Sequence, residues 1–340
     1  MVPTESSHAD GAASLLSRQL KLALTFLRDR PLWCTWLVTR RCNYRCAFCN
    51  RWQPRAAGRE LTLDEIARAA RKLAQVGTMM VGLAGGEPFL RPDFADIVRV
   101  VSRYHLCYFA SNGSLITRRR AREVIDAGLW GAGVSIDYAD ADRHDAHRGV
   151  KGAHDRAVSA LKYLSEERNG IYPQIKVMTA LMHDNLDDLP RLAALAREHD
   201  ADLLVQPYSL LKTGDEKFVH RAPVARKLLR LKAAFPNLTS NPVFLERFDT
   251  AITEGVKGCI AGRYLFCITA EGGVTECDDR TEHPVGSILT DDFPTLFRRL
   301  RERHRRNTCR ACWYNCRGEV EVFRTLRGML HSLAANFVIW

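Results

Sequence analysis

The sequence predicts an α/β protein built as a partial, TIM-like (β/α)6 barrel with a small C-terminal extension. Short apolar segments alternate with amphipathic segments of helical spacing over about 200 residues. Alternation of this kind implies parallel strands covered by helices. Six such units can be counted, whereas a closed barrel of this type needs eight, so we expect an open sheet.

The first strand is expected at 33–39, where WCTWLVT is rich in β-branched and aromatic residues. The first helix is expected at 62–76, because Thr62 and Glu65 have the spacing of a capping box and Gly77 can end the helix. The apolar run MMVGLA at 79–84 predicts a buried second strand. Further strands are predicted at 106–110, 131–136, 174–181 and 202–206, and further helices at 92–104, 117–127, 152–168 and 187–198.

The composition is that of an ordinary globular protein. The 340 residues include 50 Lys and Arg against 39 Asp and Glu, a formal charge of +11, with 46% apolar and 26% charged residues. This balance argues against a disordered or collagen-like chain. No apolar run reaches the ~20 residues of a membrane helix. The first residues do not show the pattern of a secretory signal, so we expect a cytoplasmic protein.

Two arginine-rich runs, 117–122 and 297–310, are typical of solvated helix faces. No RNA-binding module is legible, so a nucleic-acid partner is not expected. We divide the chain into an N-terminal amphipathic extension (1–32), the barrel (33–235), an auxiliary region (236–320) and a C-terminal amphipathic helix (321–340). Helices of the two terminal segments usually dock on their own core. A minority of such helices lie on membranes, so peripheral membrane contact stays open.

Eleven cysteines fall in two groups, and most of the stretch between them has no cysteine. In a reducing compartment, clustered cysteines favour metal binding or chemistry over disulfides. Cys34 and Cys107 lie in predicted strands and are interpreted as buried structural thiols. Two metal-binding regions are therefore the first functional inference.

Cys42, Cys46 and Cys49 follow the first strand directly, where a parallel α/β protein carries its active-site loops. Three thiolates can hold three irons of a [4Fe–4S] cluster and leave the fourth iron open to a small molecule. The alternative is a zinc knuckle, which needs four ligands. No further Cys or His lies nearby in sequence, so zinc would need a distant fourth partner.

The segment Gly85-Gly86-Glu87-Pro88 follows the second predicted strand and therefore shares a rim with the cysteine loop. Glycines let a ligand approach the backbone, and Glu87 offers an anion to an ammonium group. Alone, the segment also fits a simple strand-to-helix turn. Together, the CxxxCxxC and GGEP motifs resemble the radical S-adenosylmethionine (radical SAM) superfamily.

The resemblance implies a role for each motif. Cys42, Cys46 and Cys49 would hold a [4Fe–4S] cluster whose open iron binds the amino and carboxylate groups of SAM. The backbone of 85–88 and Glu87 would hold the methionine ammonium, and Phe48 would pack near the adenine. An electron from a flavodoxin- or ferredoxin-type donor would split SAM into methionine and a 5′-deoxyadenosyl radical, which abstracts a substrate hydrogen.

Other polar residues at strand ends fit the same site. Ser135 and Asp137 could bond the ribose hydroxyls. Arg148 lies in a His144–Gly149 segment that resembles the HDxxRG of the peptide-modifying branch, and it could reach the SAM carboxylate. The alternative for each is a turn or cap residue. The full set of additional cofactor-binding candidates is Asn112, Ser135, Asp137, Arg148, Asn185 and Gln206.

The C-terminal cysteines resemble a SPASM/twitch extension, which carries auxiliary iron–sulfur clusters. The match is incomplete, because Val320 stands where the pattern has a cysteine and no cysteine follows Cys316. Six thiolates could make one complete site with two spares, or two three-thiolate sites, so one or two auxiliary clusters are expected. We favour ligation by Cys259, Cys277, Cys309 and Cys312, with Cys267 and Cys316 as substitutes or a second site. Zinc is the alternative.

Asp278, next to Cys277, is a candidate catalytic base by resemblance to sulfatase-maturating enzymes, or a turn residue. The preferred substrate is a ribosomal peptide that is oxidised, cross-linked or epimerised. No winged peptide-binding domain fits before residue 33, so a separate leader-binding protein is expected. A small metabolite such as a sugar or aminocyclitol comes second and a lipid third. A non-catalytic iron–sulfur electron carrier is the alternative from another class.

Overall fold

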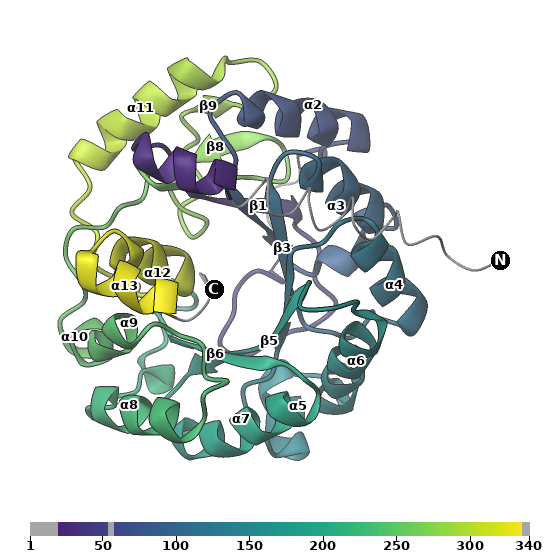
Figure 1. Cartoon of the computed structure of the whole chain (residues 1–340), viewed down its shortest axis with the longest axis vertical. Helices are drawn as coiled ribbons and strands as arrows, with labels where there is room; N and C mark the ends of the chain where they lie inside the picture. Colours follow the sequence, from purple (N-terminus) through teal and green to yellow (C-terminus); the bar gives the residue numbers. More distant parts are fainter. Residues whose placement is uncertain (1–19, 54–57, 335–340) are drawn as a thin grey trace.

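The computed structural model describes residues 20–53 and 58–334 and contains a nine-stranded sheet (Figure 1). The strand order is β6-β5-β4-β3-β2-β1-β7-β8-β9. The first six strands are parallel and neighbour one another in chain order. They are β1 (Trp33–Thr39), β2 (Met80–Gly85), β3 (Leu106–Ser111), β4 (Gly131–Ser135), β5 (Gln174–Leu181) and β6 (Asp202–Pro207).

Helices cover the convex face of this sheet, as Figure 1 shows. The crossover helices are α2 (Leu63–Ala74), α3 (Phe94–Ser102), α4 (Arg118–Asp126), α6 (Ala153–Glu167) and α7 (Leu189–Glu198). Successive side chains of β1 point to opposite faces of the sheet. Cys34 and Trp36 belong to the large core under the helices, whereas Trp33 and Thr35 face the concave side. The concave side is where a ligand can enter.

The sequence-based prediction of an open, partial barrel is confirmed. All six predicted strands are present, two of them with the predicted bounds. The sequence analysis did not predict α5 (Ala141–Arg148), because its residues ADRHDAHR carry no apolar stripe. Instead, the Asp140 side chain caps its first turn and Gly149 ends it with a φ of 69°. It also did not predict α8 (Ala225–Ala234), α9 (Pro242–Glu246) and α10 (Phe248–Thr253).

The C-terminal region continues the same sheet. β7 (Leu265–Ile268) pairs in parallel with β1, with Trp33 opposite Leu265 and Thr35 opposite Cys267. β8 (Gly273–Thr275) pairs antiparallel with β7, and β9 (Gly286–Ser287) pairs antiparallel with β8. The extension is thereby joined to the barrel through backbone hydrogen bonds. The domain boundaries at 235 and 320 remain predictions.

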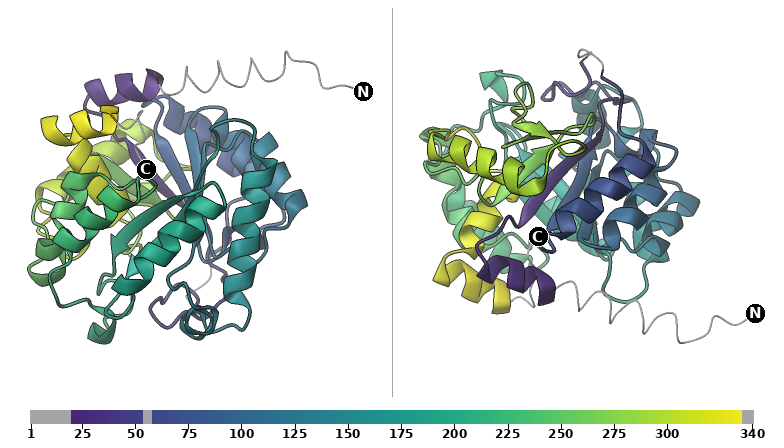
Figure 2. Two further views of the ribbon diagram at one scale, coloured as in Figure 1. Left: turned by 60° about the horizontal axis from the view of Figure 1, so that its bottom comes forward. Right: turned by 90° about the horizontal axis from the view of Figure 1, so that it is seen from above.

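Three further helices complete the described chain: α11 (Phe293–Arg305), α12 (Asn315–Phe323) and α13 (Leu326–Ala334). In Figures 1 and 2, α12 and α13 lie between the β6 side of the sheet and α11. Trp313, just before α12, stacks on Phe244 of α9 with ring centroids 5.5 Å apart. This packing places the start of α12 beside the concave face of the sheet.

The described parts of the two terminal segments are helical and meet each other. Residues 20–27 form a helix, and Phe26 packs edge-on against Phe323 at 5.0 Å. Leu20, Leu24, Leu27, Leu326 and Leu330 remain exposed. Leu16 and residues 335–340, part of the predicted amphipathic pattern, lie outside the described residues. Within 20–53 and 58–334, no helix combines the length and hydrophobicity needed to cross a bilayer.

A buried histidine gives the fold a testable pH dependence. His105 is fully buried, its Nε2 donates to the Ala70 carbonyl (3.1 Å) and its Nδ1 accepts from Met79 N–H (3.4 Å). Burial lowers its pKa from 6.5 to about 4. Between these values only the unfolded chain binds the proton, so this contribution to stability is complete above pH 6.5 and is lost as the pH falls towards 4.

We therefore expect His105→Gln to remove about 3 kcal/mol of the difference in unfolding free energy between pH 7 and pH 4. Urea unfolding of both proteins across this range measures the effect, and acid effects from other groups cancel in the comparison. Parallel pH profiles for the two proteins would contradict the assignment.

Candidate active site

The carboxyl ends of the parallel strands bring the predicted motifs to one rim. The Cys42–Cys49 loop follows β1, the Gly85–Pro88 segment ends β2, and Ser111 and Asn112 end β3. Two backbone hydrogen bonds join the first two motifs, from Gly86 N–H to the Thr39 carbonyl (3.1 Å) and from Glu87 N–H to the Arg41 carbonyl (2.8 Å). The predicted proximity of the two motifs is therefore present in the structure.

Glycine is required at position 86 by close backbone approach. A Cβ atom there would lie 2.0 Å from the Arg41 carbonyl oxygen and 2.8 Å from Cys42 N. Gly85 adopts a φ of 141°, and a Cβ atom there would lie 2.1 Å from the Thr39 carbonyl oxygen. The two glycines thus let β2 press against the start of the cysteine loop.

Glu87 ties the ends of β2 and β3 together. Its Oε1 accepts hydrogen bonds from Phe89 N–H (3.1 Å) and Ser111 Oγ (2.8 Å), and its Oε2 accepts one from Asn112 N–H (2.8 Å). The side chain is fully buried, which raises the pKa of its carboxyl although the three donors oppose that shift. Asn112 in turn donates to Asn43 Oδ1 in the cysteine loop (3.0 Å). Glu87 and Asn112 therefore position the loop in this structure.

The cysteine loop has the donor set of a three-thiolate cluster site. Burial raises the pKa of Cys42 to about 11, and the charges of Cys46 and Cys49 add to the shift, so the three sulfurs act on one another. Burial also raises the pKa of Cys46, whereas the neighbouring Arg148 lowers it. Arg148 Nη1 lies 3.9 Å from Cys46 Sγ, and its buried Nε has no hydrogen-bond partner.

A nearby cation favours the thiolate form that binds iron. The donor chemistry of the loop therefore suits an iron–sulfur cluster. Its side chains are not gathered around a metal position in this structure, and neither is any other group of three or more His, Cys, Asp or Glu among residues 20–53 and 58–334.

The polar residues at the ends of β4 and β5 are engaged with one another. Asp137 is buried, with Oδ2 accepting from Arg148 Nη2 (2.5 Å) and Oδ1 from Ala180 N–H (3.0 Å). Asn185 accepts from Met182 N–H (2.8 Å) and donates to the Asp137 and Ala180 carbonyls (2.9 and 2.8 Å). Ser135 pairs with Met178 in the β4–β5 register. The cofactor-binding roles of these residues remain predictions.

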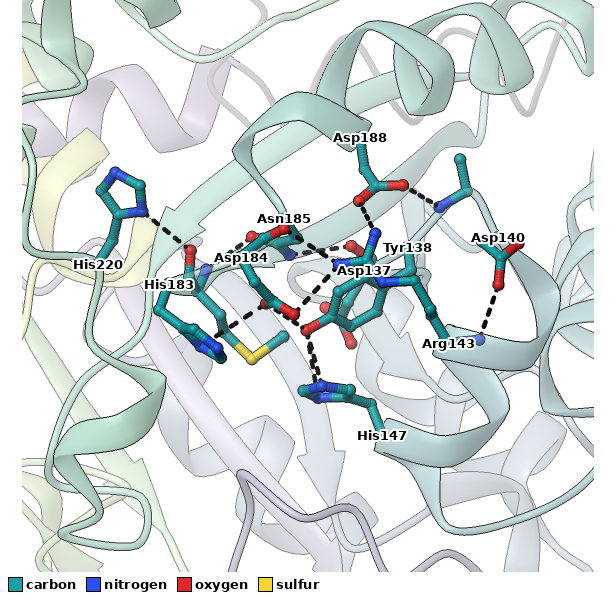
Figure 3. Close-up of polar contacts among 12 residues, drawn as sticks. Asp137, Tyr138, Asp140, Arg143, His147, His183, Asp184, Asn185, Asp188 and His220 are labelled. Atoms are coloured by element: carbon teal, nitrogen blue, oxygen red, sulfur yellow. Dashed lines mark hydrogen bonds and ion pairs between the residues drawn. The ribbon is translucent and has the colours of Figure 1, made fainter.

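Sequence analysis missed a polar group beside this pair (Figure 3). Tyr138 Oη donates to Asp184 Oδ1 (2.8 Å) and lies 2.9 Å from His147 Nε2. Arg143 bridges Asp184 and Asp188 (3.1 and 2.9 Å). Burial raises the Tyr138 pKa, and Asp184 adds to the shift, so the hydroxyl remains a donor. No local pattern marked Tyr138 or Asp184, because their pairing joins β4 and β5 loops that are far apart in sequence.

Aromatic rings line the same part of the rim. The Phe48 ring lies 6.3 Å from His147 and 6.4 Å from Phe218, and the Arg148 guanidinium stands 5.2 Å above Phe48. These distances suit a flat, partly apolar ligand group. The adenine-packing role of Phe48 remains a prediction.

Five of the six C-terminal cysteine candidates influence one another electrostatically, and four of them, Cys259, Cys277, Cys309 and Cys316, pack at the same apolar cluster. The charges of Cys259 and Cys312 act on each other, and Cys309 acts on Cys259. Cys312 also acts on Cys277 and Cys316, and burial is the main cause of the raised pKa of Cys259, Cys277, Cys312 and Cys316. Cys267 is buried within β7, where its electrostatic neighbours are Asp278, Arg51 and Asp279. Ligation by any of the six remains a prediction.

A partly buried group of four charges, the bridging cluster, connects the two cysteine regions: Arg51, Lys212, Asp278 and Asp279. Arg51, two residues after Cys49, pairs with Asp278 (2.7 Å) and Asp279 (3.3 Å). Lys212 follows β6 and pairs with Asp279 (2.9 Å). Burial opposes ionisation of Asp279, but Lys212 and Arg51 outweigh it and lower the pKa. The candidate base Asp278 is therefore already ion-paired in this structure.

Three comparisons place these features among known proteins. Residues 36–196 match the family model described as the radical SAM superfamily. The chain is 28% identical over 309 residues to the mycofactocin maturase MftC of Mycolicibacterium smegmatis, covering 85% of this chain and 78% of the relative. It is 30% identical over 327 residues to an AdoMet-dependent heme synthase of Methanosarcina barkeri, covering 88% and 86%.

The fold is also similar to a solved structure of Streptococcus suis SuiB bound to its precursor peptide SuiA. The TM-score is 0.62 at 18% identity, over 79% of this chain. The chain spans 65% of the length of SuiB.

The close approach at position 86 gives a first test of the rim. Gly86→Ala is expected to push the cysteine loop away from β2 because the new methyl group cannot fit beside the Arg41 carbonyl. We expect a stability loss of about 1–3 kcal/mol and loss of the iron bound by the N-terminal cysteines. Urea unfolding and iron counting after anaerobic reconstitution measure both effects.

Gly170→Ala is the matched control. Gly170 has a φ of 76° and nothing within 4 Å of its would-be Cβ atom, so only the backbone strain of the substitution remains. Its iron content should equal that of the wild type. Wild-type iron content in Gly86→Ala would show that the loop does not depend on this contact.

Proposed function

This chain belongs to the radical SAM superfamily, and on that premise we propose that it modifies a ribosomally made peptide by radical chemistry. The single observation that carries the proposal is the joined rim, where the three-thiol loop and the Gly85–Pro88 segment share backbone hydrogen bonds. An enzyme of this superfamily uses a [4Fe–4S] cluster and SAM. When bound, the cluster supplies the electron that splits SAM into methionine and a 5′-deoxyadenosyl radical, which takes a hydrogen atom from the substrate.

The residues of the rim divide the remaining tasks. Cys42, Cys46 and Cys49 would hold the cluster, and the backbone of 85–88 would orient the methionine end of SAM. Phe48 would pack against the adenine. Arg148 keeps a buried, partnerless Nε beside Cys46, which suits an anionic group such as the SAM carboxylate. The apolar surroundings of the cysteine loop, which include Tyr44 and Tyr138, would keep water from the radical.

The peptide substrate is supported by the relatives. MftC is named a maturase, and SuiB was solved with a precursor peptide. The C-terminal cysteines, four of which pack at one apolar cluster, support one or two auxiliary clusters that would accept an electron from a substrate radical. The net reaction would then be an oxidation such as a cross-link. A small molecule is the second candidate substrate, and the similarity to a heme synthase favours it.

Two partners belong to the proposal. A flavodoxin- or ferredoxin-type protein would donate the electron, and the formal charge of +11 favours a partner with an acidic surface. A separate leader-binding protein would deliver the peptide. We also propose a cytoplasmic location with peripheral membrane contact through the exposed leucines of residues 20–27 and of α13. If the protein does not sediment with anionic liposomes, the proposed membrane contact is wrong.

Anaerobic reconstitution followed by SAM and dithionite tests the central step. We expect 5′-deoxyadenosine and methionine in equal amounts, because one C5′–S bond breaks for each electron delivered. The Cys42→Ala/Cys46→Ala/Cys49→Ala variant should fall to the level seen without enzyme, yet keep the iron and sulfide of the C-terminal cysteines.

The Cys34→Ala/Cys107→Ala variant is the control, since both thiols are buried in strands and have no proposed role in the site. It should retain both the iron content and the formation of 5′-deoxyadenosine. A wild-type protein that binds iron but never forms 5′-deoxyadenosine would instead be an electron carrier.

A further inference from the structure

A cavity on the concave side of the sheet borders the C-terminal cysteine region. It has a volume of about 120 Å³, whereas one buried water needs only about 10–15 Å³. Strands β1, β2, β3, β5 and β6 each contribute lining residues, and Asp278 and Cys316 close it from the C-terminal side. The cavity thus borders Cys316 directly, and it adjoins the N-terminal cysteine loop through Asp278, which pairs with Arg51.

The sheet is shaped to keep this space open. β4 carries Gly131 and Gly133 towards the concave side, and a Cβ atom on Gly133 would lie 2.2 Å from both Tyr108 Oη and Met178 Sδ. Tyr108 and Met178 therefore meet across β4, joined by a hydrogen bond from Oη to Sδ (3.3 Å), and both line the cavity. They form an apolar wall opposite the start of α12.

The start of α12 supplies an unpaired amide. Asn315 lines the cavity and is only 3% exposed, but neither its Oδ1 nor its Nδ2 has a hydrogen-bond partner. Its backbone N–H is already used, donating to Gln206 Oε1 at 3.4 Å. A buried carboxamide left unpaired is unfavourable, so a ligand that pairs with both of its polar atoms binds more tightly.

The other polar groups of the cavity favour a neutral ligand. Lys212 and Asp278 line it, yet Lys212 is paired with Asp279 and Asp278 with Arg51. The bridging cluster thus offers no free charge to an ammonium or a carboxylate. A carboxamide offers one donor and one acceptor side by side, and a peptide bond presents the complementary pair.

We propose that Asn315 is a specificity-determining residue that binds a backbone amide of the substrate and so fixes, in this cavity, the residue that loses its hydrogen atom. The inference rests on the proposed function and adds the group that the site recognises. Asn315 acts by binding and positioning, and the hydrogen transfer itself belongs to the SAM-derived radical.

The test uses the reconstituted full-length enzyme with SAM, dithionite and capped amino acids. The probes are N-acetyl N′-methylamides of uniformly deuterated amino acids, compared with the matching N-acetyl methyl esters, which lack the second amide N–H. Deuterium found in 5′-deoxyadenosine by mass spectrometry reports a probe held in reach of the radical. We expect transfer from the amides to exceed that from the esters by about tenfold.

Asn315→Leu keeps the size of the side chain and removes both polar atoms. It should lower transfer from the amides by about tenfold and bring the amide-to-ester ratio close to one. Both values are taken relative to unlabelled 5′-deoxyadenosine in the same sample, so a change in cluster content next to Cys316 cancels. The exposed Asn169, substituted in the same way, is the control and should leave the ratio unchanged.

Ala110→Leu provides a second variant for the case that Asn315→Leu does not fold. Ala110 lines the cavity from β3, so the larger side chain should reduce transfer from amides and esters alike. Unchanged transfer in this variant would overturn the proposal, as would an amide-to-ester ratio that survives Asn315→Leu or equals one in the wild type. The proposal would also be overturned if the enzyme forms 5′-deoxyadenosine but no probe transfers deuterium to it. Absence of all 5′-deoxyadenosine would instead refute the proposed function.

Discussion

The arrangement of the site depends on the bridging cluster between the two cysteine regions. Arg51 belongs to the N-terminal loop, Asp278 and Asp279 follow Cys277, and Lys212 follows β6. Two cations and two anions balance, so their partial burial does not leave an unpaired charge inside the protein. Removal of one member would leave its partner partly desolvated and without compensation. The cluster therefore connects the two regions and supplies part of the cavity wall through Lys212 and Asp278.

The fold could be predicted from the sequence because its signals are local. The six parallel strands are recognisable in the sequence as short apolar runs, and the two rim motifs follow β1 and β2 directly. Parallel pairing then places the motifs together without further information. The bridging cluster could not be predicted in this way, because Arg51 and Asp278 are 227 residues apart and neither has a distinctive local pattern. The same limit applies to Tyr138 with Asp184 and to Asn315.

Hydrogen-bond saturation separates two kinds of polar residue in the site. Glu87, Asp137 and Asn185 were all expected to touch the cofactor, and in this structure each is bonded to backbone or to neighbouring side chains. They hold the rim in shape. Arg148 and Asn315 differ because each keeps a buried polar atom without a partner. Within the site, a buried polar atom without a partner is therefore a second reason, besides sequence position, to assign a residue to ligand binding.

The pairing of β7 with β1 has a consequence for how such a protein can be cut or recombined. A chain ended before residue 259 would strip β1 of its neighbour and leave a row of free backbone donors and acceptors along Trp33–Trp36. An exposed strand edge can pair with strands of other molecules, so the truncated barrel would tend to self-associate. The C-terminal extension thus protects the edge of the sheet at β1 and also carries the C-terminal cysteines. A deletion that removes the cysteines removes this protection as well.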